Sequence, residues 1–123
     1  MKPSILIVDD EPLLLNILAD KFNQENFSVS LAKDGKEGLE KALTDHPQII
    51  LLDIVMPVMD GMSMLKKLRL DEWGKNAKVI FLTNLSDANK IVESLHQDVS
   101  DYFIKSDWKL EDLVIKVKEK IGQ

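Results

Sequence analysis

Short apolar runs alternate with longer stretches of helical periodicity along the whole chain, and no other feature limits its fold as strongly. The clearest run is Ile49-Ile50-Leu51-Leu52-Asp53, which has the near-continuous apolar character of a parallel strand buried on both faces. Strands that alternate with helices form right-handed crossovers, which place parallel strands in one sheet with helices on both faces. We therefore predict an α/β fold with a doubly wound, five-stranded parallel sheet in the order 2-1-3-4-5.

Periodicity, turn residues and capping residues predict the individual elements. Strands are expected at residues 4–9, 27–31, 49–53, 78–83 and 101–104. Helices are expected at 12–23, 36–44 and 61–70, then after a cap at Ser86 or Asp87, and finally after a cap at Ser106 or Asp107. The stripe that the first helix turns toward the core is predicted to consist of Leu14, Ile17, Leu18 and Phe22.

Composition excludes several classes of function. A chain of 123 residues fits one domain, predicted to span residues 1–123 with no output domain. The net charge of −5, from 16 basic and 21 acidic residues, argues against direct binding of nucleic acid. The absence of cysteine excludes disulfides and thiolate metal sites. We see neither a signal peptide nor a membrane-spanning run, and therefore expect a cytoplasmic protein that binds no membrane.

Polar side chains stand where four of the five predicted strands end. Asp9 and Asp10 end the first strand, Asp53 the third, Thr83 the fourth and Lys105 the fifth. In a sheet of the predicted order, these ends meet in one crevice. Each residue alone has an ordinary interpretation: the acid pair as a helix start, the threonine as a strand residue, the lysine as a solvated flank. Their combination favours a functional site.

The chemistry of this set points to phosphoryl transfer. Three carboxylates within a few ångströms repel one another unless they are protonated or bind a cation. Oxygen ligands without histidine or cysteine favour Mg²⁺, or Mn²⁺, over zinc. Asp53 lies on the central strand and is our candidate nucleophile toward phosphorus. Thr83 and Lys105 are the candidate donors to the phosphoryl oxygens.

The chain resembles the receiver domains of response regulators, the CheY-like phosphoacceptor modules of two-component signalling. The resemblance rests on Ile5 to Glu11, Leu51 to Pro57, Met59-Asp60-Gly61, Phe81-Leu82-Thr83 and Asp101 to Lys105. It implies a flavodoxin-like fold and a phosphorelay in which Asp53 accepts a phosphoryl group from a histidine kinase or phosphotransfer protein. Such a module is not an enzyme beyond its own phosphorylation and dephosphorylation.

The resemblance also implies roles for further residues. Asp10 and Asp53 are expected to ligate Mg²⁺, with Asp9 acting directly or through water and Val55 through its backbone carbonyl. A switch is expected in which Thr83 moves toward the phosphate and Tyr102 turns inward. The surface of the fourth helix, fifth strand and fifth helix then changes for a downstream protein target, and the resemblance also allows phosphorylation-dependent dimerisation.

Three positions depart from the family pattern. Ser106 follows the lysine where proline is common, Asn84 follows the threonine where a small residue is usual, and Asp98 replaces a usual glycine. These departures leave open a receiver that binds proteins independently of phosphate. A Mg²⁺-dependent phosphohydrolase of small phosphate esters is a further alternative, although position 55 is valine rather than the second acid of an Asp-x-Asp pair.

Overall fold

The computed structural model describes residues 2–84, 101–105 and 109–123, and its architecture is the predicted one. Five parallel strands form one sheet in the order β2-β1-β3-β4-β5. The strands are β1 (Ser4–Val8), β2 (Ser28–Ala32), β3 (Ile49–Asp53), β4 (Val79–Thr83) and β5 (Asp101–Ile104). The helices are α1 (Pro12–Gln24), α2 (Gly35–Asp45), α3 (Gly61–Arg69), the short 3-10 helix η1 (Gly74–Asn76) and α5 (Leu110–Lys120). The predicted fourth helix lies outside the described residues.

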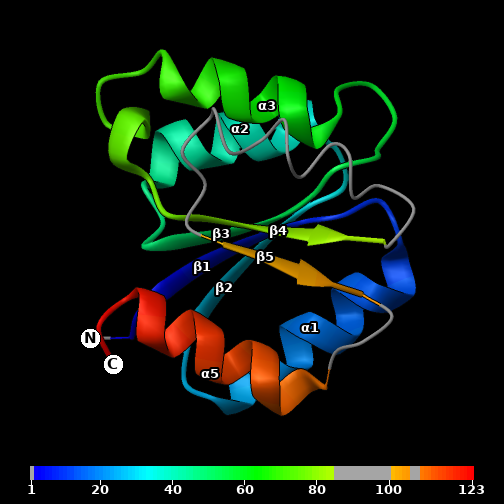
Figure 1. Ribbon diagram of the computed structural model, residues 1–123, viewed down its shortest axis with the longest axis vertical. Coiled ribbons are helices and arrows are strands. Elements are labelled where there is room, and N and C mark those ends of the chain that lie inside the picture. Colours follow the sequence, from blue (N-terminus) through cyan, green and yellow to red (C-terminus); the bar gives the residue numbers. More distant parts are fainter. Residues whose placement is uncertain (1, 85–100, 106–108) are drawn as a thin grey trace.

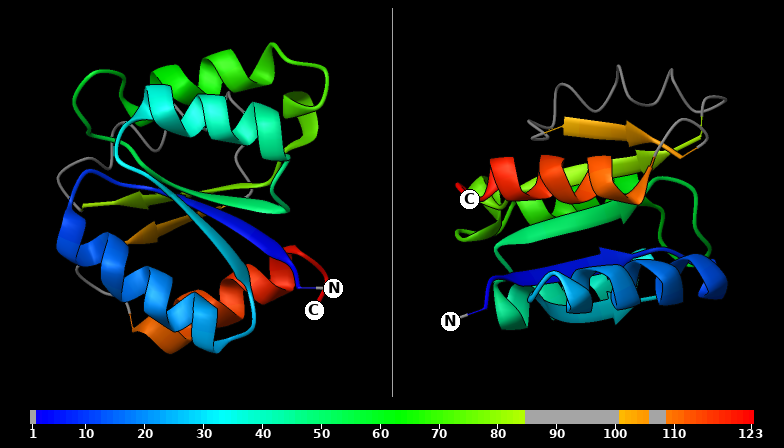
Figure 2. Two further views of the ribbon diagram at one scale, coloured as in Figure 1. Left: turned by 180° about the vertical axis from the view of Figure 1, so that it is seen from behind. Right: turned by 90° about the horizontal axis from the view of Figure 1, so that it is seen from below.

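The sheet separates two layers of helices. Helices α2 and α3 cover one face and α1 and α5 the other (Figure 1), and the view from behind shows the same division, whereas in the view from below α1 and α5 lie in front of the sheet (Figure 2). Successive strand residues point to opposite faces, so each layer has its own apolar core. Leu6, Ile50 and Leu52 belong to the core under α2 and α3. Ile7 and Leu51 belong to the core under α1 and α5.

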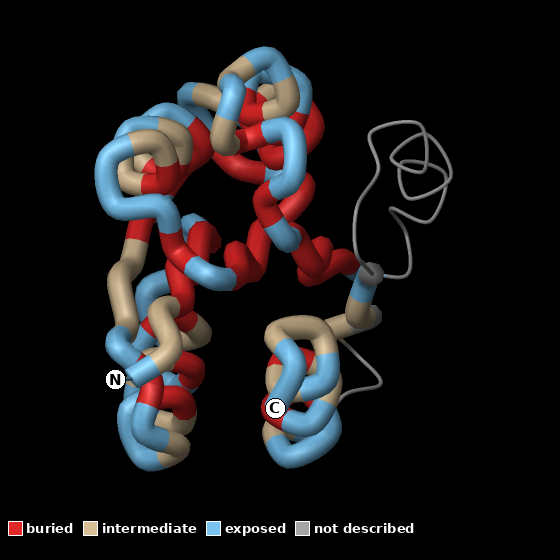
Figure 3. Tube along the Cα trace, turned by 90° about the vertical axis from the view of Figure 1, so that its left-hand side faces the viewer, coloured by how far each residue is buried: buried red, intermediate tan, exposed pale blue. Residues whose placement is uncertain are grey.

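The strand register brings the predicted functional residues to one edge of the sheet. Val8 is paired with Leu52, and Asp53 is paired with Leu82. Thr83 is paired with Ile104, directly before Lys105. Most residues of the central strands are buried, whereas the exposed residues lie on the outer sides of the helices and in the loops (Figure 3). The functional candidates therefore stand where the buried strands emerge from the core.

The predicted inward face of α1 is partly wrong. Leu18 and Phe22 are fully buried and the partly buried Leu14 packs against the same core, but Ile17 is 42% exposed and the third buried residue is Leu15. Apolar residues stand at positions 13, 14, 15, 17 and 18, so periodicity does not fix the edges of the buried stripe. Packing against the sheet decides which of these residues is buried.

The start of the last helix also differs from the expectation. Helix α5 begins at Leu110, and its N-cap Lys109 forms no capping hydrogen bond with its own side chain. The predicted capping residues at 106 and 107 lie outside the described residues. No helix among the described residues is long and apolar enough to cross a membrane.

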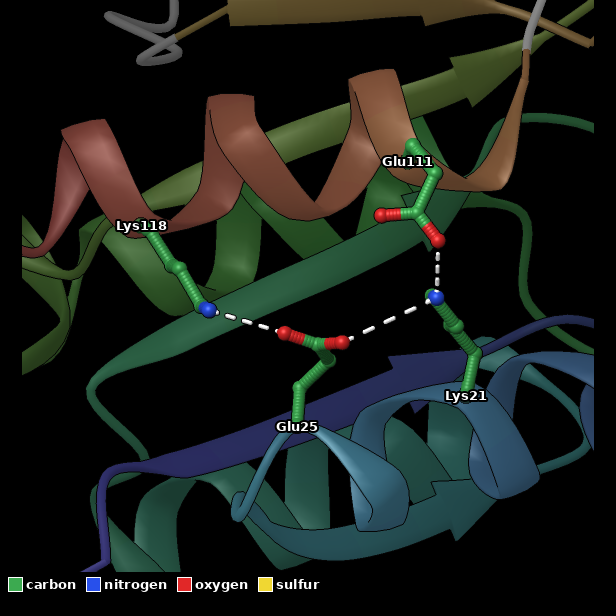
Figure 4. A network of polar contacts seen from close by, with 4 residues as sticks. All are labelled: Lys21, Glu25, Glu111 and Lys118. Carbon is green, nitrogen blue, oxygen red and sulfur yellow. Dashed lines mark hydrogen bonds and ion pairs between the residues drawn. The ribbon is translucent and has the colours of Figure 1, made fainter.

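Four charged side chains connect α1 to α5 (Figure 4). Lys21 forms an ion pair with Glu111, and Lys118 Nζ lies 2.8 Å from Glu25 Oε1. Lys21 Nζ also lies 3.7 Å from Glu25 Oε2, so the four side chains form one row of alternating charges. The hydrogen bond from Lys118 lowers the pKa of Glu25, and the one to Glu111 raises the pKa of Lys21. The two helices are therefore joined by charge at their exposed side as well as by apolar packing beneath.

Candidate functional site

An ammonium group lies between two carboxylates at the carboxyl edge of the sheet. Lys105 Nζ is 2.9 Å from Asp9 Oδ2 and 3.2 Å from Asp53 Oδ1. Asp9 is fully buried and Asp53 nearly so. The backbone N–H of Glu11 donates a 2.9 Å hydrogen bond to Asp9 Oδ1, which holds this carboxylate from its other side. The predicted convergence of the first, third and fifth strand ends is thus present.

Asp10 completes a group of three acids. One carboxylate oxygen from each of Asp9, Asp10 and Asp53 lies within 4.8 Å of the others, and Asp10 is the exposed member. Asp9 Oδ2 and Lys105 Nζ are buried, and in the part of the chain that the structure describes neither makes a hydrogen bond, although they form an ion pair. Three clustered carboxylates with one ammonium between two of them are a set of oxygen donors that fits a hard divalent cation such as Mg²⁺.

The environment of Asp53 disfavours its charge. Burial raises the pKa of the Asp53 carboxyl to about 7, and the negative charge of Asp9 adds to the rise while Lys105 opposes it. Burial lowers the pKa of Lys105, but its contacts with Asp9 and Asp53 outweigh this and hold that pKa above its usual value. The lysine therefore stays charged, and Asp53 is the group whose charge depends on what binds beside it.

Thr83 is buried at the end of β4, but its hydroxyl is turned to the backbone. Thr83 Oγ1 donates a 3.1 Å hydrogen bond to the carbonyl of Asn84, whose side chain is exposed. The Lys105 N–H donates to the Thr83 carbonyl at 2.7 Å, which ties the ends of β4 and β5 together. Tyr102 on β5 is 42% exposed. The switch roles of Thr83 and Tyr102 remain predictions.

The loop after Asp53 is held at both ends by glycines. The Gly61 N–H donates to the Ile54 carbonyl at 2.8 Å, and the Gly35 N–H donates to the Met59 carbonyl at 2.9 Å. A Cβ at Gly61 would lie 2.2 Å from the Asp53 carbonyl oxygen, so only glycine allows this approach. Between these anchors the side chain of Val55 is half exposed. The metal-binding role of its carbonyl also stays a prediction.

Sequence reasoning assigned no role in the site to Glu11. Its Oε1 lies 3.8 Å from Lys105 Nζ, and its side chain is 60% exposed. The only signal in the sequence is its position directly after the acid pair, which does not reveal where the side chain turns.

Comparison with known proteins gives one consistent result. Residues 5–118 match the response regulator receiver domain family. The response regulator PleD of Caulobacter vibrioides is 36% identical over 105 residues, which cover 85% of this chain and 23% of PleD. This chain spans 7% of the hybrid signal transduction histidine kinase D of Dictyostelium discoideum and 50% of the response regulator ArlR of Staphylococcus aureus.

Solved structures agree with the family match. A CheY-like receiver domain protein from Methanospirillum hungatei superposes with a TM-score of 0.91 at 30% identity, covering 99% of this chain and 95% of that one. The receiver domain of sensor histidine kinase PA1611 from Pseudomonas aeruginosa has a TM-score of 0.90 at 26% identity over the full length of both chains. That structure has a magnesium ion coordinated in its active-site cleft.

Proposed function

Because the chain belongs to the family of response regulator receiver domains, we propose that Asp53 accepts a phosphoryl group from a histidine kinase or phosphotransfer protein. The observation that carries this proposal is the position of the Asp53 carboxylate, nearly buried at the end of the central strand and 3.2 Å from Lys105 Nζ. A carboxylate held beside a permanent cation is suited to attack phosphorus, because the cation balances charge on the incoming oxygens.

The transfer exchanges one bond to phosphorus for another. An oxygen of the ionised Asp53 attacks the phosphorus of a phosphohistidine, forming a P–O bond as the P–N bond breaks. The electron pair of the broken bond stays on the imidazole nitrogen, and the histidine leaves as a neutral ring after it takes up a proton. Lys105 would contact one phosphoryl oxygen, and Thr83 would turn its hydroxyl from the Asn84 carbonyl toward another.

Asp9, Asp10 and Asp53, with the carbonyl of Val55, would hold Mg²⁺, and Mn²⁺ satisfies the same oxygen donors. The cation supplies positive charge that offsets the repulsion between the carboxylates and the phosphoryl group. This assignment is supported by the clustered carboxylate oxygens and by the buried Asp9 Oδ2 described above.

The output of the domain is proposed to be a change of protein-binding surface rather than turnover of a substrate. Movement of Thr83 would shift the end of β5, because the Lys105 N–H donates a hydrogen bond to the Thr83 carbonyl. Tyr102 on β5 and helix α5 would then present a different surface to a downstream protein or to a second copy of the chain. The cell compartment we propose is the cytoplasm, where the kinase would act.

Intact-mass measurement after incubation with Mg²⁺ and acetyl phosphate tests the central claim. One added phosphoryl group is expected on the unsubstituted chain, and none on Asp53→Asn or after chelation of the metal. Asp20→Asn, which removes an exposed carboxylate from α1, is the matched control and should be modified normally. An unmodified chain at saturating donor would contradict the proposal and favour a phosphate-independent binding module. Continuous release of phosphate from small esters would instead favour a phosphohydrolase.

A further inference from the structure

We propose that Glu11 is a positioning residue that takes over Lys105 when a divalent cation draws Asp9 and Asp53 away from it. This inference rests on the proposed function, because it concerns the same metal and phosphoryl site. It assigns a role to a residue that lies outside the group of three predicted metal-ligating acids.

The contacts of Lys105 single out Glu11. In the described residues the ammonium has three carboxylate partners, at 2.9 Å from Asp9, 3.2 Å from Asp53 and 3.8 Å from Glu11. Asp9 and Asp53 belong to the cluster of oxygens that fits a cation, and Glu11 does not. A cation bound to the cluster competes with Lys105 for two of its partners and leaves the third available.

The backbone of Glu11 is fixed while its side chain is not used by the helix. Its N–H donates to Asp9 Oδ1 at 2.9 Å, and its carbonyl accepts from the Leu15 N–H at 3.0 Å. Glu11 is the N-cap of α1, yet its side chain makes no capping hydrogen bond. The backbone of Glu11 is therefore fixed, its carboxylate lies 3.8 Å from Lys105 Nζ, and this side chain is not occupied by the role that an N-cap side chain usually has.

Removal of Glu11 changes the affinity for metal in a direction that depends on how Lys105 is paired in the metal-free and metal-bound states. Without metal, Lys105 has two close anions in a buried setting, so the loss of the more distant Glu11 matters little. With metal bound, the ammonium would be buried without a close counter-ion if Glu11 were absent. Removal of Glu11 should therefore weaken metal binding. Because the Glu11 carboxylate is exposed and solvent screens its charge, we expect the Kd for metal to rise by only about two- to fivefold.

Calorimetric titration of Mg²⁺ in a double-mutant cycle tests this role without any phosphorylation assay. Glu11→Gln should raise the Kd for Mg²⁺ about two- to fivefold, the range of an exposed ion pair. Lys105→Met should lower the Kd, because it removes the competing cation. In the Lys105→Met background, Glu11→Gln should change the Kd little more than Asp20→Asn does, because no ammonium remains to be held. Asp20→Asn removes the same charge about 14 Å away along α1 and measures the general charge effect.

The outcomes separate this inference from the proposed function. An equal loss of affinity from Glu11→Gln in both backgrounds would show that Glu11 acts on the metal as a simple charge, and would overturn the inference. Unchanged or tighter binding by Glu11→Gln would also overturn it. Either result would leave the proposal that Asp53 is phosphorylated standing. Absence of Mg²⁺ binding to the unsubstituted chain would instead contradict the metal assignment and this inference together.

Discussion

The charge of Asp53 is opposed by its own environment, and this makes the stability of the protein depend on pH. An unfolded aspartate has a pKa of about 3.9, whereas burial raises the pKa of folded Asp53 to about 7. Between these values the folded state binds a proton that the unfolded state lacks. The contribution of this residue to stability is therefore greatest below pH 4, falls as the pH rises toward 7, and is constant above that.

Asp53→Asn should accordingly stabilise the metal-free protein, and more at pH 8 than at pH 5. The amide resembles the protonated carboxyl, so the difference between the two gains should be on the order of a few kcal/mol. Urea unfolding at both pH values in the presence of a chelator measures it. An equal gain at pH 5 and pH 8 would show that the residue titrates normally.

Val58 is strained in the loop that follows Asp53. Its φ is 67°, a left-handed conformation that a β-branched residue rarely adopts, and its side chain is 78% exposed. Val58→Gly should stabilise the protein by about 0.5–1 kcal/mol, because relief of this conformation exceeds the added entropy of the unfolded chain. Thermal unfolding of Val58→Gly beside Val58→Ala, which keeps a Cβ, separates backbone strain from loss of side-chain volume. A lower melting temperature for the glycine variant would rule out the strain.

At the scale of elements, the charges between α1 and α5 should stabilise the packing of these helices in a salt-dependent way. Glu25 is the shared partner of Lys21 and Lys118, so Glu25→Gln removes both pairs. Its melting temperature should be below that of the unsubstituted protein at low salt, and the gap should shrink in 1 M NaCl. Glu40→Gln, on the exposed face of α2, is the comparison. A gap that is insensitive to salt would point to lost packing rather than lost charge.

The elements were predictable from sequence where a local pattern determines them. The third strand was expected at residues 49–53 and is found there, because four consecutive apolar residues that end at an aspartate have few alternatives to a strand buried on both faces. One residue of the predicted inward stripe of α1 was wrong, because apolar residues flank that stripe and sequence alone does not say that Leu15 is buried and Ile17 exposed. In the same way, strand ends predicted which residues meet, but not that the Thr83 hydroxyl turns to a carbonyl or that Glu11 reaches Lys105. Those features depend on side-chain rotation.

At the scale of the whole molecule, a cation that binds only the folded state should stabilise it. The carboxylates of Asp9, Asp10 and Asp53 converge only when β1 and β3 are paired, so the unfolded chain lacks the site. At a Mg²⁺ concentration a hundredfold above Kd, the gain should be about 2.7 kcal/mol.

Thermal unfolding with Mg²⁺ and with a chelator measures this gain. Asp10→Asn should abolish most of the shift and should raise the melting temperature of the metal-free form, because it relieves repulsion within the cluster. An equal metal shift in Asp10→Asn and the unsubstituted protein would place the cation elsewhere.

The position of β5 has a consequence for local opening of the sheet. Strand β3 is paired on both sides, whereas β5, among the described strands, is at the edge and pairs only with β4. Amide hydrogen exchange should therefore be slower in β3 than in β5. Detachment of β5 would carry Lys105 away and leave Asp9 and Asp53 facing each other without an ammonium. A bound divalent cation would offset the repulsion between these carboxylates and so lower the free-energy cost of detaching β5. The same ion that slows global unfolding should therefore speed amide exchange at β5 relative to β3.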